Sequence, residues 1–234
     1  MSLKRELPTS YISGAALSAL LVLTILNVLL QNVKITDTDG FQLLQLNASE
    51  GVANAVTTVV VYFRGFDTLG EIAVLFTASL GVGLMLNKFH EGSSKVESNF
   101  MLQVGAKLLF PIILLYGIYV MVYGHLSPGG GFQGGVIVAS GALLLLISHS
   151  DFHIPHSTIV FFETLSGVSY VIIGLMGLLM FDIFLTNILP NNIAQMGMLF
   201  SGGIIPIIYI VVGVKVGSEM SNIAQNMVKR RDDD

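Results

Sequence analysis

Residues 99–123 read NFMLQVGAKLLFPIILLYGIYVMVY and contain one charged side chain, Lys107. A helix needs about 20 mainly apolar residues to cross the hydrocarbon core of a membrane. This stretch is long enough to cross, and it is too apolar to lie on the surface of a soluble protein. Residues 99–123 are therefore predicted to form a membrane-spanning helix, which determines the fold class expected for the rest of the chain.

Other windows along the chain have the same character, because each is rich in aliphatic residues and carries at most one charged residue. They are residues 11–30, 68–86, 132–148, 158–181 and 197–216. The window at 132–148 is short and includes Gly134 and Gly135 near its start, so its first turns are expected to emerge from a glycine-rich loop. We predict an all-α integral membrane protein with about six transmembrane helices.

The overall composition supports this fold class. Of the 234 residues, 53% are hydrophobic and only 11% are charged, with a formal net charge of -4. A soluble domain has roughly 25% charged residues, so most of this surface is expected to face lipid or other apolar protein. Cysteine is absent, which excludes disulfides, thiolate zinc sites, cysteine-ligated iron–sulfur clusters and thiol nucleophiles.

Two stretches between the spans divide the chain. The apolar run at residues 52–63 is too short to cross, and residues 51–66 are predicted to lie in the interface or to pack against partner protein. Residues 87–98 (NKFHEGSSKVES) are polar and contain glycine and serine. We predict a two-span block at residues 1–87, a polar connector at 88–98 and a four-span block at 99–231.

The distribution of Lys and Arg predicts the orientation. With both ends cytoplasmic, the outside carries only Lys34 and Arg64. The inside then carries Lys4, Arg5, Lys88, Lys95, Lys215, Lys229, Arg230 and Arg231. This asymmetry favours cytoplasmic N- and C-termini. The loops near residues 125, 152 and 190 have no Lys or Arg, so only the C-terminal tail orients the last three spans.

Acidic residues occur near the start of the second span. Glu71 follows Asp67 by about one helical turn, so both carboxylates can lie on one face. In one interpretation Asp67 caps the helix and pairs with Arg64, while Glu71 strengthens the cap. In the other, Glu71 is an intramembrane carboxylate that contacts protein or water, with the hydroxyl groups of Thr68 and Thr77 as possible neighbours.

Lys107 lies about one third of the way into the third span, between Gln103 and Pro111. Proline removes a backbone N–H and frees the carbonyl group of residue 107, so a bent, polar pocket is expected there. The ammonium group could instead reach the membrane interface along its flexible stem. The alternative is an intramembrane ammonium group that takes part in proton transfer with a carboxylate partner.

Glu163 lies in the second turn of the fifth span and is followed by a stripe of small residues. Gly167, Gly174 and Gly177 lie on the same side as Glu163, which predicts that this side faces another helix rather than lipid. Gly213 and Gly217 have a GxxxG spacing in the last span and predict helix packing as well.

Three histidines follow the fourth span. His149, His153 and His156 lie beside Asp151 at spacings that would suit metal ligands on a helix. Pro155 argues against an unbroken helix, so a solvated or interfacial loop is the alternative, and we assign no metal site. No nucleophile–base pair, phosphate loop or cofactor motif occurs either, so we predict no catalytic residues in the chain alone.

The segment between the third and fourth spans is rich in glycine. His125 is followed by Pro128 and by Gly129, Gly130 and Gly131. Glycine allows close approach of the backbone, and the helix that follows begins with free N–H groups that face this loop. The loop could bind an ion, and a tight turn between helices explains it equally well.

The string YGHLSPGGGFQGGVIVASG at residues 123–141 resembles the signature of the B subunit of Mrp-type multisubunit sodium/proton antiporters, over about residues 99–231. Residues 53–56 (ANAV) and 63–71 (FRGFDTLGE) resemble the extreme C-terminal domain of the large A subunit. In related respiratory membrane complexes that domain occurs as a separate small subunit. The chain thus resembles two neighbouring parts of one assembly joined in one polypeptide.

The resemblance implies a subunit of a hetero-oligomer that exchanges Na+ for H+ across the cytoplasmic membrane, with other Mrp-type membrane subunits as partners. It implies no resident cofactor, only Na+ and H+ in transit, and no nucleic acid. Some relatives are attached to ferredoxin-oxidising hydrogenase or sulfur-reducing complexes with iron–sulfur subunits. By the family pattern, Asp67 and Glu71 match an acidic pair of the A-subunit tail, and His125, Pro128 and the glycines match the B-subunit signature.

Three hypotheses follow. In the first, Glu71, with Asp67 and with Lys107 or Glu163, lines a hydrated sodium or proton route at the junction with partner subunits. In the second, the chain is a scaffold that docks the ion-pumping subunits through its glycine stripes. In the third, it is a carrier or channel that acts alone.

Overall fold

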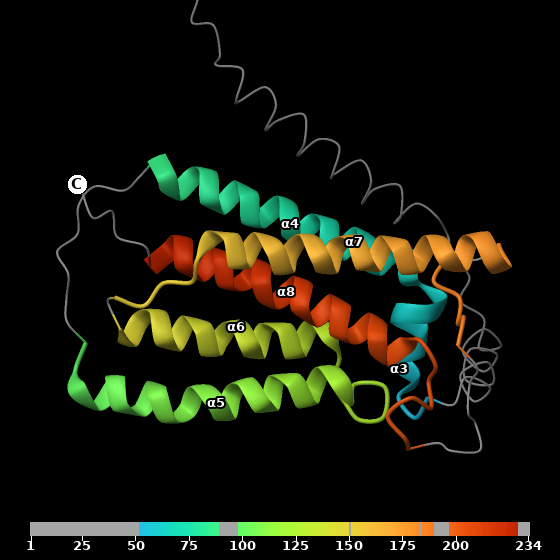
Figure 1. Cartoon of the computed structure of the whole chain (residues 1–234), viewed down its shortest axis with the longest axis horizontal. Coiled ribbons are helices and arrows are strands. Elements are labelled where there is room, and N and C mark those ends of the chain that lie inside the picture. Colours follow the sequence, from blue (N-terminus) through green and yellow to red (C-terminus); the bar gives the residue numbers. More distant parts are fainter. Residues whose placement is uncertain (1–51, 89–97, 150, 183, 190–196, 229–234) are drawn as a thin grey trace, which may run out of the picture. The chain divides into compact units, whose positions relative to one another are not determined.

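The structure is a computed structural model that describes residues 52–88, 98–149, 151–182, 184–189 and 197–228. All of these residues belong to one compact unit, Leu43–Asp234. Every regular element in the described residues is a helix (Figure 1). The predicted span at 11–30 and most of the polar connector lie outside them.

Five helices are long and apolar enough to cross a membrane, which confirms the all-α membrane fold class. They are α4 (Gly65–Lys88), α5 (Phe100–Val122), α6 (Gly131–Ser148), α7 (His156–Phe181) and α8 (Ile205–Val228). Before them lie a single turn, α3 (Ala55–Thr57), and a short π-helix, η1 (Thr58–Phe63). Asn99 caps α5 as its side chain accepts a hydrogen bond from the Met101 N–H.

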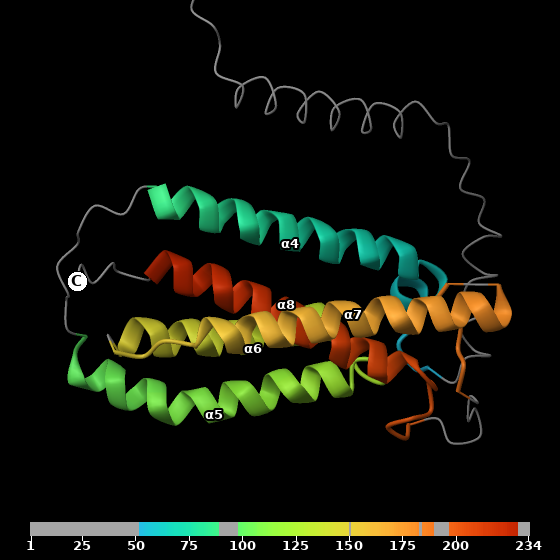
Figure 2. The same cartoon turned by 45° about the horizontal axis from the view of Figure 1, so that its top comes forward.

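Helix α8 forms the centre of the described bundle. It packs against α4, α5, α6 and α7, and Figures 1 and 2 both show it between α4 and α6. Ile208, Val212 and Val216 of α8 are buried together with Ile72 of α4 and Tyr170 of α7. The helix with the most partners is therefore also the one whose apolar residues form the core.

Helices α6 and α8 approach each other along facing glycines. A Cβ atom added at Gly135 would lie 2.7 Å from Gly213 O and 2.8 Å from Val216 Cβ, and one added at Gly131 would lie 2.5 Å from Tyr209 O. Only glycine fits at these positions, because the obstacles include backbone atoms that cannot rotate away. Gly213 thus faces α6 of the same chain.

The predicted bounds of the last span were wrong. The prediction was residues 197–216, whereas residues 197–204 form turns and the helix continues to Val228. Pro206 lies in the first turn of α8, where its missing N–H removes no helical hydrogen bond, so it is compatible with the start of the helix. The prediction ended the span at its first charged residue, Lys215, but a paired charge inside a bundle need not end a helix.

The short segment before α4 packs against the chain itself. Asn54 donates its backbone N–H to His125 O and its side-chain amide to Gly124 O and Ser127 O. The Thr57 hydroxyl also donates to Gly124 O, at 2.9 Å. The segment predicted to lie in the interface or on partner protein therefore rests on the glycine-rich loop between α5 and α6.

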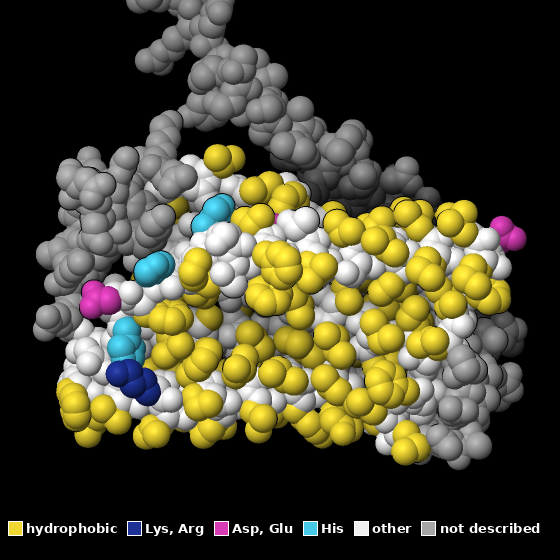
Figure 3. Space-filling model, viewed as in Figure 1, with side chains coloured by type: hydrophobic (Ala, Val, Ile, Leu, Met, Phe, Trp, Pro, Cys, Tyr) yellow, Lys and Arg dark blue, Asp and Glu magenta, His cyan; other side chains and the backbone are white. Residues whose placement is uncertain are grey.

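The outer faces of several helices are apolar. Exposed side chains of α5 include Leu108, Ile112 and Leu115, and those of α4 include Val74 and Leu84. The face in Figure 3 is covered by hydrophobic side chains, while histidine and basic side chains gather toward one end of it. This pattern fits helices that contact lipid or other membrane helices.

Candidate functional site

The predicted acidic pair lies at the start of α4. Asp67 Oδ2 forms an ion pair with Arg64 Nη2 at 2.5 Å, and both side chains are exposed. This ion pair is the Arg64 contact of the first interpretation, and an exposed pair of this kind contributes about 0–1 kcal/mol. Glu71 is exposed as well, and no ion-pair partner for it is found within the described residues.

The predicted hydroxyl neighbours of Glu71 bond to the backbone. Thr68 is buried and donates to Val60 O at 2.8 Å, and Thr77 is exposed and donates to Ala73 O at 2.8 Å. The Tyr170 hydroxyl of α7 donates to Gly65 O at 2.7 Å and thereby fixes the start of α4. The start of α4 is thus held against α7, while the Glu71 carboxylate lies on the exposed surface.

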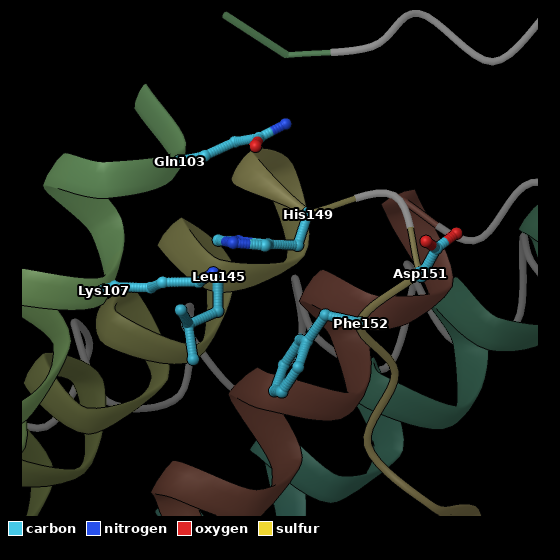
Figure 4. Close-up of a pocket in the computed structure, with 6 residues that line it drawn as sticks. All are labelled: Gln103, Lys107, Leu145, His149, Asp151 and Phe152. Carbon is cyan, nitrogen blue, oxygen red and sulfur yellow. The ribbon is translucent and has the colours of Figure 1, made fainter. Parts of the chain in front are cut away.

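Lys107 faces an open cleft between the start of α5 and the end of α6. The cleft has a volume of about 330 Å³, and Figure 4 shows the Lys107 side chain of α5 and the His149 side chain at the end of α6 extending toward each other. Gln103, Leu145, Asp151 and Phe152 complete the lining. Lys107 is exposed, and Pro111 lies inside α5 as expected. The cleft brings Lys107 close to the histidine loop rather than to the other predicted ion-path residues.

Glu163 of α7 belongs to a charge cluster in the interior of the bundle. Lys215 Nζ of α8 lies 2.7 Å from Glu219 Oε1 and 3.6 Å from Glu163 Oε1. The side chains are 9% exposed for Lys215, 0% for Glu219 and 14% for Glu163. We call these three residues the charge triad. Its two carboxylates and one ammonium group carry a net charge of -1 when all are ionised.

An aromatic ring, a glycine and two serines border the triad. The Phe76 ring of α4 lies 4.8 Å from Lys215 Nζ, a distance at which an aromatic face attracts a cation. A Cβ atom added at Gly167 would lie 3.7 Å from Lys215 Cε, so this glycine borders the lysine stem. The hydroxyl groups of Ser166 and Ser218 donate to backbone carbonyls. The triad therefore combines residues of α7 and α8 under an aromatic ring of α4.

Sequence reasoning missed Lys215 and Glu219 as site residues. Lys215 was assigned to the end of a span, and Glu219 was placed beyond it. The available signal was their spacing of four residues, which puts a basic and an acidic side chain on one helical face. Glu163 was singled out because it is expensive in a span, but its partner could not be read from the sequence.

The glycine-rich loop forms a buried junction around His125. The His125 side chain is fully buried, and its Nε2 lies 3.5 Å from Met198 O. Its Nδ1 is buried and has no hydrogen-bond partner within the described residues. Gly130 has φ of 157°, and a Cβ atom on Gly124 would lie 2.8 Å from Gly130 Cα. The loop thus joins the turn before α3, the start of α6 and the turns before α8.

Stability is expected to depend on pH through His125. Burial lowers the pKa of His125 from 6.5 and outweighs the opposing effect of its hydrogen bonds to backbone carbonyls, with Met198 first. Below pH 6.5 the unfolded chain therefore binds more protons at His125 than the folded chain does. The contribution of His125 to the free energy of unfolding should decrease as the pH falls below 6.5 and stay constant above it. Thermal unfolding of the complex at several pH values measures this, and His125→Gln should remove that part of the pH dependence. An unchanged pH profile in the variant would contradict the assignment.

The other residues predicted from the glycine-rich loop and the glycine stripes lie as follows. Pro128 is exposed, Gly129 is partly buried, and Gly131 begins α6. Gly174 and Gly177 of α7 are buried, and the Phe184 ring covers Gly174. A Cβ atom on Gly217 would make ordinary contact with Gly135 O at 3.4 Å. These glycines therefore contact other parts of the same chain.

The histidine loop shows no metal site within the described residues, since no group of three or more His, Cys, Asp or Glu side chains there could hold an ion. His149 Nδ1 lies 2.7 Å from Ser148 Oγ. His153 and His156 are exposed. His149 is therefore part of the cleft beside Lys107, while the other two histidines lie on the surface.

Two family models match the chain. The model described as a domain related to the MnhB subunit of Na+/H+ antiporter matches residues 101–222, more than half of the chain. The model that describes the E subunit of MBH matches residues 4–101. The chain is 44% identical over 52 residues to the B subunit of a Na(+)/H(+) antiporter from Bacillus subtilis, and the match covers 22% of this chain and 36% of that protein.

Solved structures are also similar. A chain of the membrane-bound sulfane sulfur reductase, an archaeal respiratory membrane complex, has a TM-score of 0.74 and 40% identity, over 94% of this chain and 99% of that one. A chain of the Mrp complex from Dietzia sp. has a TM-score of 0.69 and 21% identity, over 100% of this chain and 27% of that one, which shows a shared fold. Together with the five apolar helices, these matches identify a multi-pass membrane protein whose relatives are subunits of larger membrane complexes. The chain belongs to the family of domains related to the MnhB subunit of Na+/H+ antiporters.

Proposed function

We propose that the chain is a membrane subunit of an Mrp-type Na+/H+ antiporter module and takes part in sodium and proton translocation within a multisubunit complex. We place it in the cytoplasmic membrane with both termini on the cytoplasmic side. The family match supports the module, and the distribution of Lys and Arg supports the orientation.

The observation that carries the proposal is the charge triad. A charged side chain near the middle of a spanning helix costs about 2.5–3.5 kcal/mol on insertion scales, and such residues mark ion or proton routes. Here three charged side chains gather between α7 and α8, with one carboxylate fully buried. A subunit that served only to dock others would be as stable with apolar residues at these positions.

Glu71 supplies a second part of the route, at the junction with partner subunits. Its carboxylate lies on an exposed face of α4 that also carries Asp67 one turn earlier and Val74 one turn later. A carboxylate on such a face is expensive against lipid, so a polar group of a partner subunit or water is expected beside it. Asp67 and Thr68 lie in the first turn of α4, Thr77 lies further along the same helix, and all three line the route in this proposal.

Replacing Glu71 with glutamine should abolish sodium-driven pH change in inverted membrane vesicles while the complex stays assembled, because the amide keeps the shape and removes the charge. The pH change is followed with a fluorescent dye after sodium is added, and assembly is checked on native gels. Asp182→Asn is the matched control, since Asp182 is exposed at the end of α7 and away from the triad. Full exchange in the Glu71 variant would remove Glu71 from the mechanism.

The partners we propose are other Mrp-type membrane subunits, with hydrogenase-like or iron–sulfur subunits in a redox-linked form of the complex. The similarity to a chain of the sulfane sulfur reductase complex supports the redox-linked form. Purification of the intact complex through a tag on this chain tests it. Iron in stoichiometric amounts would indicate redox subunits, and an iron-free complex would indicate a plain antiporter.

A structural scaffold is the second candidate function, and the exposed apolar faces of α4 and α5 favour it. Leu84 of α4 and Leu115 of α5 are 74% and 73% exposed. If docking were the whole function, replacing Leu84 or Leu115 with polar residues would release the subunit, while the Glu71 and triad variants would exchange ions normally. Native gels and vesicle exchange assays on one set of variants separate the two candidates.

A further inference from the structure

We propose that the charge triad binds a single exchangeable proton, with the unpaired Oε2 atom of Glu219 as its acceptor. This inference rests on the proposed function and specifies which ion this part of the route holds. The step is a simple protonation. One O–H bond forms on the Glu219 carboxylate as a proton arrives, the triad changes from a net charge of -1 to 0, and the same bond breaks when the proton leaves.

The first argument is the imbalance of charge in a buried place. The ammonium group of Lys215 offsets only one of the two carboxylates, and Glu219 is 0% exposed. An uncompensated charge away from water is strongly disfavoured, and such a group responds by taking or losing a proton. The addition of one proton therefore removes the excess charge from the interior of the bundle.

The second argument is the free acceptor atom on Glu219. Oε1 lies 2.7 Å from Lys215 Nζ, whereas Oε2 is buried and has no hydrogen-bond partner among the residues that the structure describes. Buried polar atoms are nearly always paired, so an unpaired carboxylate oxygen in the interior is an acceptor for a bound proton. Glu163 keeps some contact with the surface, at 14% exposure, and its Oε1 lies 3.6 Å from Lys215 Nζ.

The third argument separates a proton from a sodium ion. Hard cations prefer several oxygen ligands, and here the Lys215 ammonium group already contacts both carboxylates, at 2.7 and 3.6 Å. The Phe76 ring, which borders the ammonium group at 4.8 Å, offers no oxygen ligand. A proton needs one oxygen lone pair and no further space.

Because the three groups interact strongly, the proton belongs to the triad as a unit. Lys215 holds the Glu219 carboxylate on one side, and Glu163 can receive the ammonium group when Glu219 becomes neutral. Glu163 lies one α7 turn before Gly167, whose missing side chain leaves room for the lysine stem to move. The arrangement therefore lets Lys215 shift between two carboxylates as the proton binds and leaves.

The test is infrared difference spectroscopy on the purified, intact complex, taken across a pH titration in water and in deuterium oxide. A protonated carboxyl group gives a carbonyl band that an ionised carboxylate lacks, and the band shifts on deuteration. The native complex should show one such band that disappears in Glu219→Gln. The band should return at a shifted frequency in Glu219→Asp, and this result would exclude a folding defect as the cause of its loss in Glu219→Gln. The band should persist in the control variant Asp182→Asn.

Ion exchange in vesicles provides an independent readout. If the band depends on Glu219 and exchange is lost in Glu219→Gln, both proposals stand. If the band depends on Glu219 but every triad variant and the Glu71 variant exchange ions normally, the proton site stands and the proposed function fails. If the band is unchanged in Glu219→Gln, or if added sodium removes it at constant pH, the proton-site inference is overturned, and the Glu71 assay still decides the proposed function.

Discussion

Replacing Lys215 with methionine is expected to destabilise the subunit strongly. The change leaves the Glu163 and Glu219 carboxylates in the interior without the ammonium group that lies 3.6 and 2.7 Å from them. Breaking a buried ion pair by removing one partner costs about 3–5 kcal/mol. The measurement is thermal unfolding of the purified complex, together with the amount of subunit retained on native gels.

Two further variants make this result specific. Lys107→Met changes the same residue type on an exposed part of α5 and should have little effect on stability. The combination of Lys215→Met with Glu219→Leu should recover most of the lost stability, because replacing buried charges together by apolar groups is often neutral. Equal stability of Lys215→Met and Lys107→Met would show that the triad is not a coupled unit.

The second large effect is expected at Gly135, where α6 meets α8. A leucine side chain there must displace Gly213 O and Gly217 N, which lie 2.7 and 3.0 Å from the position of its Cβ atom. These are backbone atoms of the central helix, so the helices must separate and lose their packing. We expect loss of about 3 kcal/mol or more, comparable to the upper range of steric insertions into packed cores.

Gly105→Leu is the matched control for this prediction. Gly105 also lies within a spanning helix, but a Cβ atom added there meets nothing within 4 Å. The control should assemble and unfold like the native protein, whereas Gly135→Leu should be degraded or recovered free of its partners. Expression level, native gels and thermal unfolding measure the difference. A stable, assembled Gly135→Leu variant would contradict the close packing of α6 and α8.

Most spans could be predicted from the sequence because hydrophobic length leaves few alternatives. The third span was predicted at residues 99–123 and is α5, Phe100–Val122. The fourth was predicted at 132–148 and is α6, Gly131–Ser148. A run of about 20 apolar residues has to satisfy its backbone polar groups internally in lipid, so a helix is its only solution.

The parts that could not be predicted depend on contacts between distant residues. Hydropathy treats Lys215 as a boundary, while the bundle surrounds it with Glu163, Glu219 and the Phe76 ring. Likewise, the position of Asn54 on the glycine-rich loop follows from hydrogen bonds to residues about 70 positions later. The relative axial position of helices α7 and α8 determines which of their polar side chains come into contact. This position cannot be predicted from the sequence pattern of either helix alone.

The roles of the predicted ion-path residues stay predictions. The structure places Asp67 beside Arg64 and Lys107 in a cleft near the histidine loop, and it leaves Glu71 exposed. At each junction between subunits, this chain supplies only its own residues, and the partner subunit supplies the others. The functional assays described for Glu71 and the triad therefore require the assembled complex.

The hydrogen bonds from Asn54 and Thr57 to Gly124 connect two parts of one polypeptide. Asn54 and Thr57 belong to the part that resembles the A-subunit tail, and Gly124 belongs to the part that resembles the B subunit. If these parts were separate proteins, the same contact would have to form by diffusion between two molecules in the bilayer. A covalent link raises the effective concentration of one half near the other and fixes their ratio at one to one. Their presence in one chain thus turns a step of assembly into a step of folding.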